Sequence, residues 1–387
     1  MTRSLVTTAG EMLKAVRLAR APIQRWSSIP ILEYVHIDRN KITGTDLDIE
    51  VTATFYALSA ELKACIHAVE LLHVLEGVQR DTVIRFTPAG ENKIAAQFDG
   101  AVYFLSSLPA DDFPFMSFTK LPVRVDVKND GLSAAMKRVR YAISTEETRY
   151  YLNGVCLWKH ENGRCAIVAT DGHQLALQRL ACELPFEKQI IPSRALNFIT
   201  SRSGEPSAMT LADAKAGFEW PDVSMMTKLI DGYYPDIARV MPKQDEPATS
   251  IFLPKRQTMA ALNRATNCRT GGFPKCVSFR ACPGGLFISN YQQKGADRLH
   301  IEQVTGFEPD SLGGQTITFA VNAPYLLSML GADRGPDAFE LKYAGEGKPL
   351  YHARPDGMSV LMPARQDVPL TEAIVESLMS GNPEAIA

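Results

Sequence analysis

Apolar residues recur every three to four positions in several stretches of the chain, which is the spacing of amphipathic helices. Three of these stretches resemble one another and lie about a third of the chain apart, at 11–17, 134–140 and 260–266. A second set follows them, at 70–75, 194–199 and 325–330. The pattern predicts two helices in each of three similar units. The competing interpretation is chance likeness between amphipathic helices.

Runs with strand character lie between the predicted helices and are separated by turn signals rich in Gly, Asn and Pro. The clearest runs are 34–37, 83–86, 166–169, 277–280 and 317–320. The expected fold class is α+β, with three tandem copies of a β-sheet-rich domain that carries two helices each. Proline and charge interrupt the pattern twice, which places the domains at 1–121, 122–246 and 247–365, with 366–387 as a C-terminal extension.

The first helix of each unit has a basic face. In the second unit, Lys137 and Arg138 lie outside the buried apolar stripe of the helix. In the first unit, Lys14 and Arg17 lie outside the corresponding stripe. The chain has 41 basic and 43 acidic residues, so it is not a polycation as a whole. The repeated bias indicates either a phosphate-facing surface or ordinary solvated helix faces.

Composition and motifs exclude several kinds of chemistry. With 45% hydrophobic and 22% charged residues, the 387-residue chain is typical of soluble proteins with two or three domains. The apolar runs are too short to span a bilayer, so we expect a cytoplasmic protein with no membrane partner. The seven cysteines contain no C-x-x-C pair, and no phosphate loop or metal motif occurs, so we expect no metal and no cofactor.

One short motif leaves two interpretations open. Asp171 and His173 are two residues apart and could act as an acid–base pair, which would make the chain an enzyme. The same residues, with Gly172 between them, are also typical of a tight turn in which Asp binds backbone amides. The turn is the favoured interpretation.

Two strings at a fixed separation are more specific. STEETRYYLNG at 144–154 and ATDGHQLA at 169–176 closely resemble the middle domain of the bacterial DNA polymerase III β subunits, the sliding clamps. Segments 228–240, 319–322 and 359–365 are similar to later signatures of that family, in the right order. The resemblance covers about residues 1–365 and agrees with the threefold repeat.

The resemblance implies a DNA clamp fold and a head-to-tail homodimer that forms a six-domain ring around double-stranded DNA. The implied role is a processivity factor, which is not an enzyme, and the contacts with DNA would be independent of sequence. The residues implied to face DNA are Lys14, Arg17, Arg25, Lys137, Arg138, Arg149, Tyr150, Tyr151 and Arg194. At the joint between subunits, Tyr103 and Leu105 would face Asn267 and Cys268.

The resemblance also implies a peptide-binding pocket on each subunit. Its partners would be the DNA polymerase III alpha subunit, the clamp loader, and other polymerases and repair proteins that carry clamp-binding peptides. The matching pocket residues are Leu152, Thr170, Gly172, His173, Gln174, Leu175, Pro235, Arg239, Val240, Val360, Met362, Pro363, Ala364 and Arg365. Such a pocket is apolar, with a few polar groups at its rim.

The chain departs from the family pattern at several points. The family usually has Arg where Gln174 stands and Met where Ala364 stands, and its chains commonly end one residue after the position of Arg365. The alternative role is therefore a specialised paralogue with altered partner or inhibitor specificity. The extension is expected to be a loosely ordered tail that contains a short helix within 371–379. A second hypothesis folds either segment 366–370, which faintly resembles a clamp-binding peptide, or the helix after it over the pocket.

Overall fold

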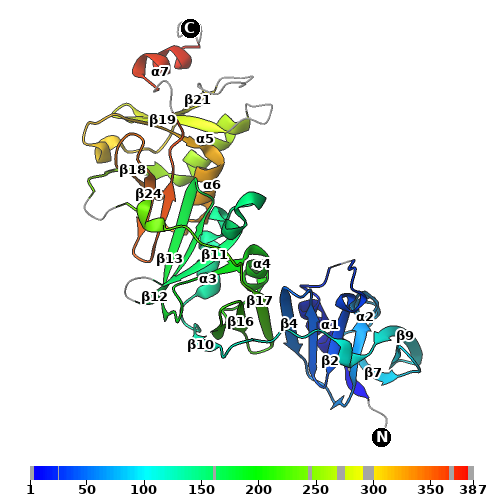
Figure 1. Cartoon of the computed structure of the whole chain (residues 1–387). Helices are drawn as coiled ribbons and strands as arrows, with labels where there is room; N and C mark the ends of the chain where they lie inside the picture. The colour runs from blue at the N-terminus through cyan, green and yellow to red at the C-terminus, as the bar shows by residue number, and fades with distance from the viewer. Residues whose placement is uncertain are drawn as a thin grey trace. The chain divides into compact units, whose positions relative to one another are not determined.

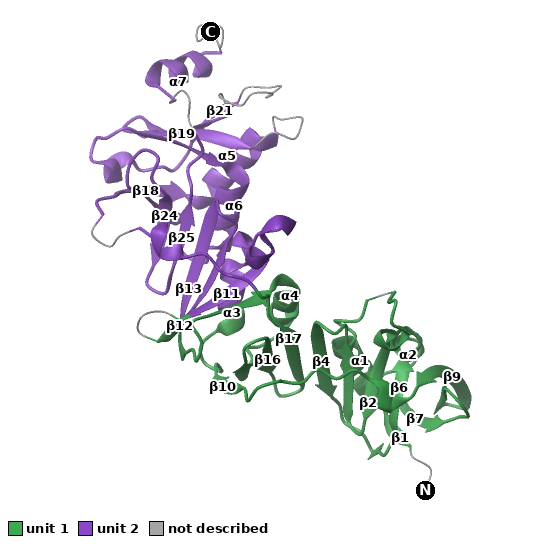
Figure 2. Cartoon of the chain, in the orientation of Figure 1, with its two compact units in different colours: residues 1–134, 159–164, 181–231 green, residues 135–158, 165–180, 232–387 purple. Residues whose placement is uncertain are grey.

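The structure is a computed structural model that describes residues 4–24, 26–159, 163–242, 246–267, 275–290, 300–365 and 370–381. Two compact units divide the chain: unit 1 holds residues 1–134, 159–164 and 181–231, and unit 2 holds 135–158, 165–180 and 232–387 (Figure 2). The middle third of the sequence contributes to both units. The three domain boundaries expected from the sequence therefore stay a prediction.

Unit 1 is built on one antiparallel sheet of thirteen strands, in the order β10-β15-β16-β17-β4-β3-β2-β6-β9-β8-β7-β1-β5. The strands of the first third are β1 (Leu5–Thr8), β2 (Tyr34–Asp38), β3 (Lys41–Thr45), β4 (Ile49–Thr54), β5 (Ser59–Ala60), β6 (Lys63–His67), β7 (Val83–Pro88), β8 (Lys93–Phe98) and β9 (Ala101–Leu108). The later strands of unit 1 are β10 (Val123–Asp126), β14 (Lys188–Pro192), β15 (Ala208–Leu211), β16 (Lys215–Glu219) and β17 (Val223–Lys228). Strands β17 and β4 pair antiparallel and join the two groups into one sheet.

The helices of unit 1 are α1 (Ala9–Ala19), α2 (Ala68–Glu76) and α4 (Ser193–Ser201). Helix α1 packs on α2, β3 and β4 (Figure 1). Thr8 caps α1 by accepting a hydrogen bond from the backbone N–H of Glu11, as a Thr before an apolar-periodic run predicts. The apolar stripe of α1, which includes Met12 and Val16, is fully buried.

Unit 2 contains most of α3 (Leu132–Val139) and of the strands β11 (Gly154–Lys159), β12 (Arg164–Thr170) and β13 (Gln174–Glu183). Its other helices are α5 (Lys255–Asn267), α6 (Ala323–Ala332) and α7 (Glu372–Met379). Its other strands are β18 (Thr249–Pro254), β19 (Cys276–Cys282), β20 (Gly285–Ser289), β21 (Ile301–Val304), β22 (Ile317–Asn322), β23 (Ala338–Tyr343), β24 (Leu350–Arg354) and β25 (Gly357–Leu361).

Two sheets organise unit 2. In one, the strand order is β11-β12-β13-β25-β24-β23-β18, and in the other it is β21-β20-β19-β22. Helices α5 and α6 pack together over a core of apolar side chains from both sheets. The six helices predicted by periodicity are confirmed, and each of the five predicted strand runs lies inside an observed strand.

The C-terminal extension differs from the expectation of a loosely ordered tail. The predicted helix is present as α7, and it packs on the sheet that contains β20 and β21. Its Ile374 and Val375, together with Leu370, are buried against Phe287 and Ile301. Residues 366–369 lie outside the described residues.

Gly44 on β3 allows α1 to lie directly on the sheet. A Cβ atom at this position would lie 2.1 Å from the carbonyl oxygen of Ala19 and 3.0 Å from Ile23 Cδ1. We expect Gly44→Ala to lower the free energy of unfolding of unit 1 by about 3 kcal/mol, because α1 must move away from the sheet. In the control Gly77→Ala, where the nearest atoms are 3.7 Å away, chemical denaturation is expected to give a change of less than about 0.5 kcal/mol.

Candidate functional site

An apolar cavity of about 190 Å³ opens on unit 2. Its walls come from the segment that ends at Leu152, the turn between β12 and β13, the segment 235–240, and the end of β25. The structure brings together ten of the residues predicted for the peptide pocket: Leu152, Thr170, Gly172, His173, Gln174, Leu175, Pro235, Val240, Val360 and Met362. Their role in peptide binding stays a prediction.

The turn between β12 and β13 shapes the cavity rim. Asp171 Oδ1 accepts hydrogen bonds from the backbone N–H of His173 (2.8 Å) and of Gln174 (2.9 Å). Gly172 adopts a φ of 91°, which glycine tolerates best. The tight-turn interpretation of this motif is therefore confirmed. The Asp171 carboxylate is engaged in holding the backbone, and the His173 ring stacks on Tyr325 with centroids 5.8 Å apart.

Gln174 is held firmly below this turn. Its side chain is buried, and its Nε2 donates to the backbone oxygen of Tyr141 (3.1 Å) and to Asp171 Oδ2 (3.0 Å). Both partners are acceptors, so they fix the orientation of the amide. The cavity consequently has a neutral, immobile side chain at the position where the resembled family usually carries a cation.

Four further residues line the cavity: Arg149, Tyr151, Asp236 and Ile237. Two of these, Arg149 and Tyr151, are among the residues predicted to contact DNA, and the structure places them at the cavity. Arg149 binds Glu146 (2.7 Å), and this hydrogen bond lowers the pKa of the Glu146 carboxyl. Its guanidinium lies over Gly172, where any Cβ atom would come within 2.6 Å of Arg149 Nη1.

A second hollow of about 570 Å³ shares one residue, Met362, with the cavity. The predicted pocket residues Pro363, Ala364 and Arg365 line this hollow. Arg239 lines neither space, and its side chain is 86% exposed, so the structure does not support its place in the pocket. Phe287 and Ile301, on which α7 packs, also line neither space. The hypothesis that the helix of the tail covers the pocket is therefore wrong.

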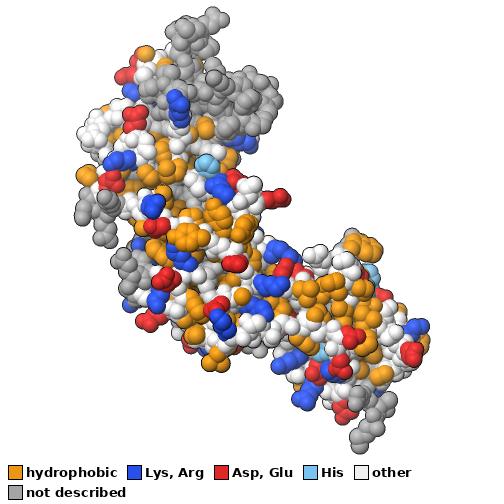
Figure 3. All heavy atoms as spheres, in the orientation of Figure 1, with side chains coloured by type: hydrophobic (Ala, Val, Ile, Leu, Met, Phe, Trp, Pro, Cys, Tyr) orange, Lys and Arg blue, Asp and Glu red, His pale blue; other side chains and the backbone are white. Residues whose placement is uncertain are grey.

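Most of the basic residues predicted to face DNA are paired with carboxylates of their own unit. In unit 1 the nitrogen–oxygen distances are 3.3 Å for Lys14–Asp222, 2.9 Å for Arg17–Glu76 and 2.5 Å for Arg194–Asp46. Figure 3 shows the same mixing, with Lys and Arg interspersed among Asp and Glu on the face in view. Lys137 is exposed and forms no ion pair within the described part of the chain, whereas Arg25 lies outside it.

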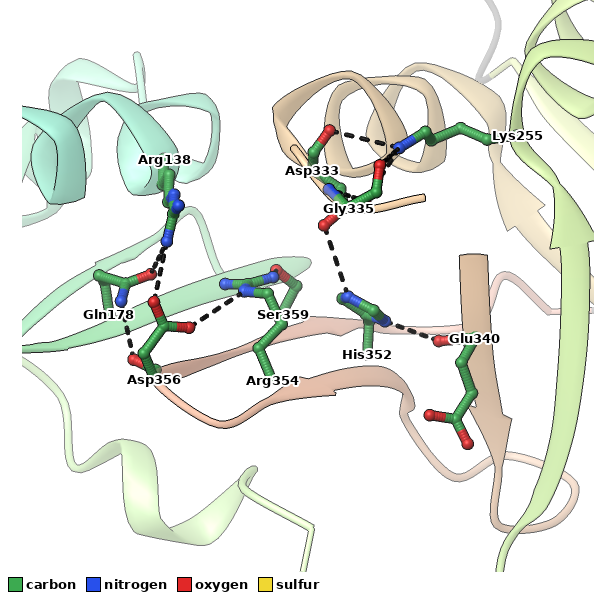
Figure 4. Close-up of polar contacts among 10 residues, drawn as sticks. All are labelled: Arg138, Gln178, Lys255, Asp333, Gly335, Glu340, His352, Arg354, Asp356 and Ser359. Atoms are coloured by element: carbon green, nitrogen blue, oxygen red, sulfur yellow. Dashed lines mark hydrogen bonds and ion pairs between the residues drawn. The ribbon is translucent and has the colours of Figure 1, made fainter. Parts of the chain in front are cut away.

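Arg138 is held by two side chains of unit 2. Its Nη1 donates to Asp356 Oδ2 (2.9 Å) and to Gln178 Oε1 (3.3 Å), and Figure 4 shows it pointing from α3 toward both. Burial opposes ionisation of Asp356, but hydrogen bonds from Gln178 and Arg138 outweigh this and lower its pKa. The carboxylate therefore stays ionised and offsets the charge of Arg138.

Of the four residues predicted for the subunit joint, two are exposed, one is buried and one lies outside the described residues. Tyr103 is 48% exposed and stacks on Phe98, and Asn267 is exposed at the end of α5, but Cys268 lies outside the described residues. Leu105 is only 3% exposed, because it packs inside unit 1, and it offers almost no surface to a partner. The neighbouring Val102 and Phe104 are exposed instead.

The described ranges hold neither a membrane-spanning helix nor a metal-binding cluster. No helix there is long and apolar enough to cross a membrane, and no group of three or more His, Cys, Asp or Glu residues lies close enough to hold a metal ion.

Known proteins match both the sequence and the fold. The family model described as "DNA polymerase III beta subunit, central domain" matches residues 126–236. A β sliding clamp of Caulobacter vibrioides is 27% identical over 374 residues, which cover 92% of this chain and 97% of the relative. The crystal structure of a β sliding clamp from Caulobacter crescentus matches with a TM-score of 0.81 and 26% identity, over 94% of this chain and 99% of that one.

The chain is similar to the β sliding clamps over nearly its whole length, and its central part matches the model of their central domain. The β sliding clamp of Bacillus subtilis is also similar, at 23% identity over 92% of this chain and 95% of the relative. The matches extend over nearly the whole length of these clamps, so the repeated α+β clamp fold expected from the sequence is confirmed. The tail helix α7 follows the position at which the resemblance ends.

Proposed function

We propose that this chain is a ring-forming processivity factor of bacterial DNA replication. Two copies would join head to tail, encircle duplex DNA and tether the replicative polymerase through the cavity of unit 2. The chain acts as a non-catalytic accessory subunit of DNA polymerase III, because holding and sliding require no bond to be made or broken. The observation that carries this proposal is the apolar cavity, assembled from four separate segments in a chain with the clamp fold.

The cavity suits short peptides. An apolar floor with Leu152, Leu175 and Val360 would take aliphatic side chains, and Met362 adapts its shape to different ones. The proposed ligands are clamp-binding peptides of the DNA polymerase III alpha subunit, the clamp loader, and other polymerases and repair proteins. The second hollow beyond Met362 gives the peptide a place to continue.

The basic helices support binding to the DNA backbone. Lys137 is the strongest candidate for a phosphate contact, because no carboxylate of the described residues offsets its charge. Lys14, Arg17, Arg138 and Arg194 already have partners and would contribute less. Such partly neutralised contacts would be weak and independent of sequence, as sliding requires.

Charge reversal tests the DNA surface. We expect Lys137→Glu to lower the affinity for a short DNA duplex about tenfold and to reduce the slope of log affinity against log salt by about one. Fluorescence anisotropy at several salt concentrations measures both quantities. Lys41→Glu, on strand β3, is the matched control and is expected to leave both unchanged. An equal loss in the two variants would contradict a helix-lined DNA surface.

A second candidate function is that of a specialised clamp with a narrower set of partners or a different sensitivity to inhibitors of the pocket. The neutral Gln174, the small Ala364 and the docked tail favour it. In a competition assay, peptides from several partners of a standard clamp should displace one another from a general clamp. Binding of only one of them would favour the specialised role.

A further inference from the structure

Strand β21 lies at one edge of its sheet and is held from both sides. Within the described residues it pairs only with β20, so its other edge is free. On one face, Glu302 of β21 binds Arg264 of α5 (2.8 Å), and Asn290, which follows β20, donates to the backbone oxygen of Ala265 (3.4 Å). The end of α5 and this edge strand therefore form one surface.

Helix α7 holds the opposite face of the same strands. Leu286 and Ile288 point into the core, so Phe287 between them lies on the outer face, where it meets the tail together with Ile301. Arg280 fastens the start of the tail by donating to the backbone oxygen of Leu370 (3.4 Å) and by pairing with Glu372 (3.6 Å). The edge strand lies between α5 and α7.

The first third of the chain offers a complementary edge. Strand β9 pairs with β8 along residues 101–106 but reaches β6 only at 107–108, so its first part also has a free edge. That part exposes three consecutive apolar side chains, Val102, Tyr103 and Phe104. Exposed apolar strand edges are surfaces that pair with another strand unless they are protected.

We propose that α7 is a brace for the joint between two copies of this chain. It holds β21 in an extended, ordered form, so that the free edge of this strand can receive the β9 edge of a second copy. Asn267 is polar and Leu105 is buried, so the side-chain contacts predicted for the joint contribute little to its stability. The brace compensates by keeping β21 ordered. This inference rests on the proposed ring.

Full-length variants test the brace. The dimer dissociation constant is measured by light scattering over a dilution series for the unchanged chain, Ile374→Asp and the matched control Ala373→Asp, which changes an exposed position of the same helix. We expect Ile374→Asp to raise the dissociation constant at least tenfold and Ala373→Asp to leave it unchanged. The milder Glu372→Ala, which removes only the pair with Arg280, should raise it less.

The possible outcomes distinguish a failure of the proposed brace from a failure of the proposed ring. Peptide binding at the cavity of unit 2 reports whether each variant is folded. If Ile374→Asp binds peptide normally and dimerises as tightly as the unchanged chain, or more tightly, the brace is wrong and the ring stands. If the unchanged chain is a monomer of 42.6 kDa at every concentration, the ring is wrong and the brace falls with it.

Discussion

Replacement of Met362 by Asp is expected to lower the affinity for a clamp-binding peptide at least thirtyfold. Met362 lines both the apolar cavity and the neighbouring hollow, so a peptide that occupies the two spaces must pass over it. A carboxylate at this position would have to lose water against the apolar side chains of the ligand. Loss of such a central contact costs about 2 kcal/mol or more, which corresponds to the expected thirtyfold change.

The measurement is fluorescence anisotropy with a labelled peptide from a bacterial DNA polymerase III alpha subunit. The side chain of Met362 is 36% exposed, so the substitution should leave the fold of unit 2 intact. Met379→Asp is the matched control, because Met379 is an exposed methionine on α7 that lines neither space. If both variants bind the peptide like the unchanged chain, peptides do not use this cavity.

The sequence predicts local structure here more reliably than it predicts contacts. Helix α3 was expected at 134–140 and is found at Leu132–Val139, because its apolar spacing depends only on residues one turn apart. The tail helix was likewise expected. Its docking depends on Phe287 and Ile301, which lie far away in the sequence and carry no local signal.

At the candidate site, too, the sequence predicts location better than contacts. The strings that carry the resemblance locate the cavity, but they do not reveal the direction of each side chain. Arg149 interrupts the short 3₁₀ segment around it with φ −112° and ψ 48°, and this kink accompanies its position at the cavity. The available sequence signal for this position was that Arg149 lies close in sequence to the pocket residue Leu152, within the string 144–154.

The resemblance implied that Tyr103 and Leu105 both lie at the joint, and strand residues two apart do share a face. Burial differs along β9 nonetheless: residues 101–106 pair with β8, β6 is reached only at 107–108, and Val102, Tyr103 and Phe104 are exposed whereas Leu105, nearer β6, is buried. A change of pairing partner within one strand depends on tertiary structure. The pattern of hydrophobic and polar positions does not contain it.

Substitution of Tyr103 by Asp is expected to convert the proposed dimer to monomers. A closed ring of two copies has two identical joints, so the substitution acts twice. If the loss at each joint is about 2 kcal/mol, the total is about 4 kcal/mol, or roughly a thousandfold weaker association. Light scattering should then give the chain mass of 42.6 kDa at concentrations where the unchanged chain has twice that mass.

Retention on DNA provides the second readout of the same substitution. A ring that encircles DNA stays on a closed circle and slides off a linear duplex, whereas a monomer is held by neither. Leu121→Asp is the control, because this side chain is 95% exposed and outside the predicted joint. If the Tyr103→Asp chain keeps the dimer mass at the lowest concentrations, the β9 edge is not the joint. If it is monomeric yet still distinguishes circular from linear DNA, encirclement by two joined copies is not how this chain holds DNA.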